Sequence, residues 1–144
     1  MVAPAFGFSV GDFLAAGGLI VKICKALREA GGAASEYQQV IIELEGLQRC
    51  LNHLQALEPD EYNTARVNAL RGMALSVRIP LEEFLRKLQQ YEQSMGPFAS
   101  RARLHGASKK AKWAVTVTEE VNRFRAIIVA KTVSINLLIG IHNS

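Results

Sequence analysis

An apolar seam that repeats every three or four residues constrains the fold of this chain more than any other feature. Its residues are Tyr37, Val40, Leu44, Leu47, Leu51 and Leu54. This spacing places all of them on one side of an α-helix, whereas a half-buried strand would alternate apolar and polar residues. A seam of three heptads is compatible with a coiled coil between chains. A short glycine-rich turn to another helical stretch instead favours an antiparallel hairpin within one chain.

A second helix is predicted immediately before this seam. Ser9 and Asp12 fit a capping box that starts the helix near Val10, and Gly31-Gly32 ends it. A second capping box, of Ser35 and Gln38, opens the seam helix. That helix should end near Ala56, because a Glu-Pro-Asp sequence follows it.

Helical spacing continues through the rest of the chain. It resumes after Pro59 and again beyond Pro80, which either kinks one long helix or starts a new one at its N1 position. Beyond a basic loop over 98–107, Ser108 is the expected cap of a last helix, and a strand over 126–133 is disfavoured because no other segment alternates with period two. The core residues expected after the seam are Val67, Leu70, Ala74, Val77, Leu81, Phe84, Leu88, Tyr91, Trp113, Val117, Val121, Phe124, Ile128, Ile135 and Leu138.

These elements together predict the fold class and the domain organisation. The chain has 144 residues, which is enough for one domain with a substantial core. Few aromatic residues and only four prolines argue against a β-sandwich or barrel. We expect an all-α protein, a single antiparallel helical bundle of four or five long helices over residues 1–144.

The front of the first helix is more apolar than a surface helix needs to be. The nine residues between Asp12 and Lys22 carry no charge, and at about 1.5 Å per residue they cover roughly 14 Å. A membrane span needs about 20 such residues. Small residues at near-helical spacing, Gly11, Ala15 and Gly18, would let another helix backbone approach closely.

This helix therefore supplies the candidate membrane and oligomerisation residues. They are Phe6, Phe8, Asp12, Phe13, Leu14, Leu19, Ile20 and Val21. Asp12 has two interpretations. It is favoured as a residue that stabilises the helix N-terminus, and its alternative role is to line a pore or limit insertion, because an ionisable group near lipid is costly.

Positive charge is concentrated in one later segment. The formal net charge is +4, and no acidic residue occurs between Glu92 and Glu119. The basic residues of this segment are Arg101, Arg103, Lys109, Lys110 and Lys112. They form either a solvated loop or a patch for anionic lipid headgroups. Nucleic acid is an unfavoured partner, because only Trp113 offers an aromatic ring beside them and no recognised binding motif is present.

Groups that could carry chemistry do not converge in the sequence. His53, His105 and His142 are far apart, and neither Cys24 nor Cys50 has a histidine at a neighbouring helical position. No glycine-rich loop follows a strand and opens onto a helix. We expect no catalytic, cofactor-binding or metal-binding residues, and a protein that is not an enzyme. Two cysteines inside helices, with no secretory signal, predict a cytoplasmic protein with reduced thiols.

Several stretches of the chain together resemble a known family. The opening FGFSVGDF, the turn GGAASEYQ, the seam IIELEGLQRCLNHLQALEP and the closing MGPFA and KAKWAV resemble the HeLo-like N-terminal domains of fungal NLR/STAND-type receptor proteins. The likeness runs from Phe6 to about Leu138. It implies a bundle similar to those of the HET-S prion system, the mixed-lineage kinase-like pseudokinase and the coiled-coil domains of plant immune receptors.

The resemblance also implies a function. Such domains are signalling and cell-death modules of innate immunity, held inert until a partner domain oligomerises them, after which the N-terminal region attacks a membrane. In this chain the matching segment is Phe6 to Val21. Asp12 interrupts its apolar run, which departs from a full transmembrane span.

The favoured prediction is an N-terminal signalling or cell-death effector module that oligomerises and targets membranes through its first helix. The alternative is a structural oligomerisation or regulatory protein-interaction bundle without membrane activity. The expected partners are further copies of the chain, a downstream sensor domain of a longer multidomain protein, and anionic membrane lipids. The expected location is the cytoplasm, with membrane association on activation.

Overall fold

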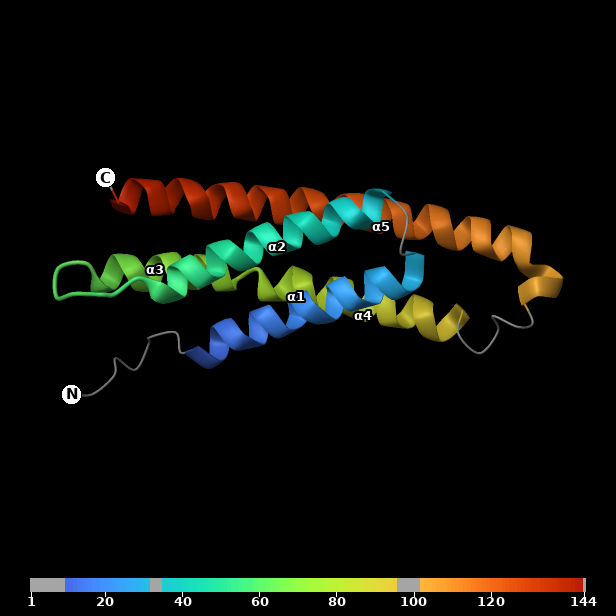
Figure 1. Ribbon diagram of the computed structural model, residues 1–144, viewed down its shortest axis with the longest axis horizontal. Coiled ribbons are helices and arrows are strands. Elements are labelled where there is room, and N and C mark those ends of the chain that lie inside the picture. The colour runs from blue at the N-terminus through green and yellow to red at the C-terminus, as the bar shows by residue number, and fades with distance from the viewer. Residues whose placement is uncertain (1–9, 32–34, 96–101, 144) are drawn as a thin grey trace.

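Five helices make up the described part of the chain (Figure 1). The computed structural model describes residues 10–31, 35–95 and 102–143, and the side chains of residues 10–29, 37–90 and 119–143. The helices are α1 (Val10–Gly31), α2 (Ser35–Ala56), α3 (Thr64–Leu75), α4 (Arg78–Met95) and α5 (Ala102–Asn143). The described ranges contain no strand, so the all-α prediction is confirmed.

The chain reverses direction between the long rods of the bundle. In Figure 1, α2 returns antiparallel to α1, α3 and α4 together run in the direction of α1, and α5 returns along the direction of α2. Helix α1 packs mainly against α2 and α4, while α5 packs against α2, α3 and α4. The predicted antiparallel hairpin of the first two helices is therefore confirmed, and α1 and α5 lie on opposite sides of the bundle.

The seam of α2 is the centre of the core. All six of its apolar residues are buried, and they belong to one continuous apolar cluster with residues of the other four helices. Burying one large aliphatic side chain stabilises a fold by about 1.5–3 kcal/mol. The predicted core residues that are buried beyond α2 are Val67, Leu70, Ala74, Val77, Leu81, Phe84, Leu88, Val121, Phe124, Ile128 and Ile135. Leu138 is partly buried against the cluster, while Tyr91, Trp113 and Val117 lie outside the described side chains.

Most helix boundaries agree with the prediction. Helix α1 begins at Val10 and ends at Gly31, and α2 ends at Ala56; the proposed cap Ser9 lies outside the described residues. The helix is interrupted between α3 and α4, so Pro80 belongs to the first turn of a new helix rather than to one long kinked helix. It is the third helical residue instead of the first, and its missing N–H removes no intrahelical hydrogen bond there.

The predicted start of the last helix is wrong. Helix α5 begins at Ala102, six residues before the expected cap Ser108, so most of the expected basic loop is helical. The physical reason is that alanine, arginine and leucine, which all favour helix, make up four of the six residues 102–107. The single Gly106 costs only about 1 kcal/mol, which is too little to end a helix of this length.

An arginine of α3 closes the C-terminal end of α2. The guanidinium of Arg71 donates hydrogen bonds to the carbonyl oxygens of Leu54 at 3.2 Å, Gln55 at 3.2 Å and Leu57 at 2.7 Å. The last carbonyls of a helix have no partner within the helix, and they carry the negative end of its dipole. One side chain therefore binds two carbonyls of the last turn of α2 and the carbonyl of the residue that follows the helix, and it joins the two helices.

Polar contacts fix α5 along α2. The guanidinium of Arg125 donates to both carboxylate oxygens of Glu43, at 2.8 and 3.0 Å. The thiol of Cys50 donates to Oδ1 of Asn136 at 3.1 Å. Glu43 precedes Cys50 in α2, and their partners Arg125 and Asn136 occur in the same order in α5, so the two helices run parallel. The fork-like pairing of guanidinium and carboxylate also sets the register of α5.

Candidate interaction surfaces

The predicted site on α1 is divided between the core and the surface. Phe13 and Ile20 are only 4% and 3% exposed, and Leu19 is partly buried against the core. Leu14 and Val21 are 68% and 66% exposed. Residues seven apart lie on the same face of a helix, and adjacent residues point about 100° apart. Phe13 and Ile20 therefore share one face, and Leu14 and Val21 share another. Two of the predicted residues therefore anchor α1, and two face outward.

The outward residues belong to a narrow apolar face, which we call the α1 stripe. It consists of Val10, Leu14, Gly18 and Val21, all exposed and spaced by three or four residues. No described atom lies within 4 Å of a Cβ placed on Gly18. A Cβ on Gly17 would lie 3.0 Å from the amide oxygen of a glutamine on α2. A Cβ at Gly17 would thus require the end of a glutamine side chain of α2 to shift, whereas the bundle gives no reason for Gly18.

Of the remaining predicted residues, only Asp12 has a described side chain. Asp12 is half-exposed in the first turn of α1, where a carboxylate complements the positive end of the helix dipole. Phe6, Phe8 and Arg101 lie outside the described residues. Arg103, Lys109, Lys110 and Lys112 lie on the first part of α5, and their side chains are not among those described. Four of the five basic residues thus lie on a helix.

A second exposed apolar face, on α5, was missed by the sequence reasoning. Val129, Val133, Leu137 and Ile141 follow one another at intervals of four and are 43% to 63% exposed. We call them the α5 stripe. Other residues of the same turns, such as Ile135, are buried. The available signal was that this part of the helix is apolar all round, which is typical of a deeply buried or lipid-facing helix.

The same part of α5 has the dimensions of a membrane-spanning helix. Among the described residues, Glu119–Asn143 is the one segment that is long and apolar enough to cross a bilayer, by length and composition. It has 25 residues, and only 22% of its most apolar stretch is buried inside the bundle. A core helix passes the same test, but it would be mostly buried.

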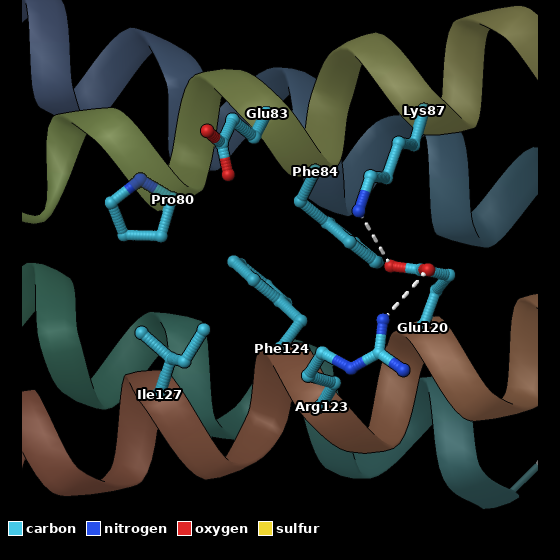
Figure 2. A pocket seen from close by; sticks show the side chains of 8 residues that line it. All are labelled: Pro80, Glu83, Phe84, Lys87, Glu120, Arg123, Phe124 and Ile127. Atoms are coloured by element: carbon cyan, nitrogen blue, oxygen red, sulfur yellow. Dashed lines mark hydrogen bonds and ion pairs between the residues drawn. The ribbon is translucent and has the colours of Figure 1, made fainter.

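A small hollow lies between α4 and α5 (Figure 2). The rings of Phe84 and Phe124 stack at its centre with centroids 4.0 Å apart. Glu120 accepts hydrogen bonds from Nζ of Lys87 at 2.9 Å and from Nη1 of Arg123 at 3.0 Å. The hydrogen bond from Lys87, aided by both positive charges, lowers the pKa of Glu120 despite its partial burial. The volume is about 80 Å³, well below the roughly 300 Å³ of small-molecule sites, so this contact joins two helices.

The two cysteines are buried as free thiols. Burial raises the pKa of both Cys24 and Cys50, which keeps them in the unreactive thiol form. Within the described residues, no group of three or more histidine, cysteine, aspartate or glutamate side chains is placed to hold a metal ion.

Comparisons of the chain with protein families, with curated proteins and with solved structures found no match. A function is therefore inferred from the chain's own surfaces. The α1 stripe and the α5 stripe are the two apolar faces from which that inference proceeds.

Proposed function

We propose that the protein is a signalling or cell-death effector module that self-associates and targets membranes through α1. The observation that supports this proposal is the α1 stripe, in which Leu14 and Val21 stand exposed on a helix that Phe13 and Ile20 anchor in the core. Contiguous exposed apolar faces mark sites for partners or membranes. The resemblance to HeLo-like domains points to the same helix.

The anchored face of α1 implies that this helix stays in the bundle until a partner acts. Phe13, Ile20, Ile23 and Leu27 are all buried, and each would lose about 1.5–3 kcal/mol if it were exposed to water. The stripe itself is small, so one copy binds lipid weakly. Clustering by a downstream domain would link several copies and raise their combined affinity without any new contact. The α1 stripe would then engage a membrane only when the protein is clustered.

Leakage of dye from anionic vesicles tests this proposal, with every variant fused at its C-terminus to the same tetrameric domain so that the copies are clustered. We compare the wild type with Leu14→Glu/Val21→Glu, which changes only exposed residues of α1. The control Ile42→Glu/Ile79→Glu adds the same charge at exposed aliphatic residues of other helices. We expect leakage from the wild type and the control, and a loss of leakage with the α1 variant. Equal leakage from all three proteins, or none from the wild type, would overturn the proposal.

The alternative is a structural or regulatory oligomerisation bundle without membrane activity. It is favoured by the deep burial of Ile20 and by the close approach of α1 to α2 at Gly17. It predicts that Leu19→Glu/Ile20→Glu unfolds the domain. It also predicts that light scattering detects oligomers of the wild type, and that the wild type causes no dye leakage from vesicles. A folded double variant in a thermal melt would count against this alternative.

A further inference from the structure

Helix α5 lies on the side of the bundle opposite α1, so the α5 stripe is a separate surface from the α1 stripe. We propose that the exposed face of the second half of α5 is a separate membrane-docking surface, which lies against the acyl-chain region of an anionic bilayer while the bundle stays folded. This inference goes beyond the proposed role of α1 and does not depend on it.

The first support is an uncharged exposed face that extends along α5. Besides the α5 stripe, the exposed residues of this part are Ala126, Ile127, Ala130, Ser134, Asn136 and Gly140. From Ala126 to Ile141 the helix rises roughly 23 Å. Lys131 is the one Asp, Glu, Lys or Arg in that stretch, and its ammonium donates to Oγ of Ser76, beside the break between α3 and α4. Water therefore meets a long apolar face without an acidic group.

The second support is low burial, which suits a lipid surface better than a protein core. Only 22% of the most apolar stretch of Glu119–Asn143 is buried inside the bundle. The opposite face is held by buried Ile128 and Ile135 and by the pairing of Arg125 with Glu43. With that face fixed, the helix docks in the plane of the membrane interface rather than across it.

The third support is the charge of α5. This helix carries seven lysines and arginines against two glutamates, while the whole chain has a net charge of only +4. The positive excess of the protein is thus confined to α5, and it precedes and flanks the apolar stretch. Basic residues next to an apolar helix attract anionic headgroups and bring the apolar face to the surface.

The available area argues against a second copy as the occupant. From their exposed fractions, the four side chains of the α5 stripe present on the order of 400 Å². A stable dimer needs about 800 Å² on each partner. A bilayer needs no complementary shape, because its acyl chains adapt to any apolar face.

The test is flotation of the protein with vesicles of phosphatidylcholine alone or with about one-third phosphatidylserine. The variant is Val133→Glu/Leu137→Glu, and its control is Ile42→Glu/Ile79→Glu, which changes the charge equally at exposed residues elsewhere. We expect the wild type and the control to bind the anionic vesicles. The partition coefficient of the α5 variant should fall about tenfold or more. Val133→Ser/Leu137→Ser, which adds no charge, should reproduce most of that loss.

Three outcomes would overturn the inference: no binding by the wild type, equal loss in the control, or unchanged binding by both α5 variants. A wild-type dimer in light scattering that the α5 variants convert to monomer, with no vesicle binding by either, would assign the face to a second copy instead. Leu14→Glu/Val21→Glu separates this inference from the proposed function. If the Leu14→Glu/Val21→Glu variant still binds vesicles, the result supports docking through α5. If this variant alone loses binding, docking through α5 is overturned.

Discussion

Replacing Arg71 with methionine tests how α2 is terminated. The guanidinium lies half-buried and donates to three backbone carbonyls at the end of α2, at 2.7 to 3.2 Å. Methionine keeps the apolar stem of the side chain but removes the charge and every donor. We therefore expect Arg71→Met to destabilise the bundle without creating a cavity.

The size of the effect follows from the hydrogen bonds. A hydrogen bond to a charged group contributes about 1.5–3 kcal/mol. Because the site is only half-buried, water would replace part of the three bonds, so we expect a net loss of about 2–3 kcal/mol. For a protein of this size, that corresponds to a decrease in Tm of about 4–12 °C.

Thermal and urea unfolding followed by circular dichroism measure this loss. Arg71→Lys should recover about half of it, because one ammonium keeps the charge but lacks the fork of donors. The control is Arg66→Met, at an exposed arginine of the same helix, and its Tm should change by no more than about 1–2 °C. If Arg71→Met and Arg66→Met unfold at the same temperature, the carbonyl contacts contribute nothing and the reasoning is refuted.

Three further predictions concern α1 and the contact between α4 and α5. In urea unfolding, Gly18→Ala should stabilise the protein by about 0.5–1 kcal/mol, and Gly17→Ala should gain less, because its Cβ would lie 3.0 Å from a glutamine side chain; equal gains would contradict the packing described. Ile20→Ala should lower the free energy of unfolding by about 2–5 kcal/mol, and Leu14→Ala by less than about 1 kcal/mol. Similar losses would contradict the burial of Ile20 and the exposure of Leu14. The pKa of Glu120 is lowered by folding, so the unfolded state binds more protons in acid. Its contribution to stability is present above the ordinary pKa of 4.5 and is lost as the pH falls through the folded-state value. Urea midpoints from about pH 7 down to about pH 3 should therefore fall less steeply for Glu120→Gln, and identical slopes would exclude this pairing as a cause.

Periodicity predicted the parts of the fold that depend on burying one face of a helix. The α2 seam from Tyr37 to Leu54 is buried at every predicted position, because a regular apolar stripe on a polar helix has only one side that can face a core. The stop at Gly31 was predictable for a local reason as well, since glycine readily ends a helix.

Rotation of a helix, in contrast, depends on its neighbours. Helix α1 is apolar on several sides, so the sequence did not distinguish buried Ile20 from exposed Leu14. The α5 stripe escaped detection for the same reason, because buried Ile135 lies only two residues from exposed Leu137 in an apolar run. Which face of such a helix is buried depends on contacts between segments that are distant in the sequence. The hydrogen bonds from Arg71 to carbonyls 14 to 17 residues away are one example of such contacts.

The pairing of α2 with α5 also sets the order in which the bundle can be completed during synthesis. Glu43 and Arg125 are separated by 82 residues, so the face of α2 that receives α5 has no partner while the intervening chain is made. At about 5–20 residues per second, the 42 residues of α5 alone require roughly 2 to 8 s. The first four helices spend that interval on the ribosome with one side of α2 uncovered. Nascent chains on neighbouring ribosomes can meet through this side, and it is the surface that a ribosome-associated chaperone would have to shield.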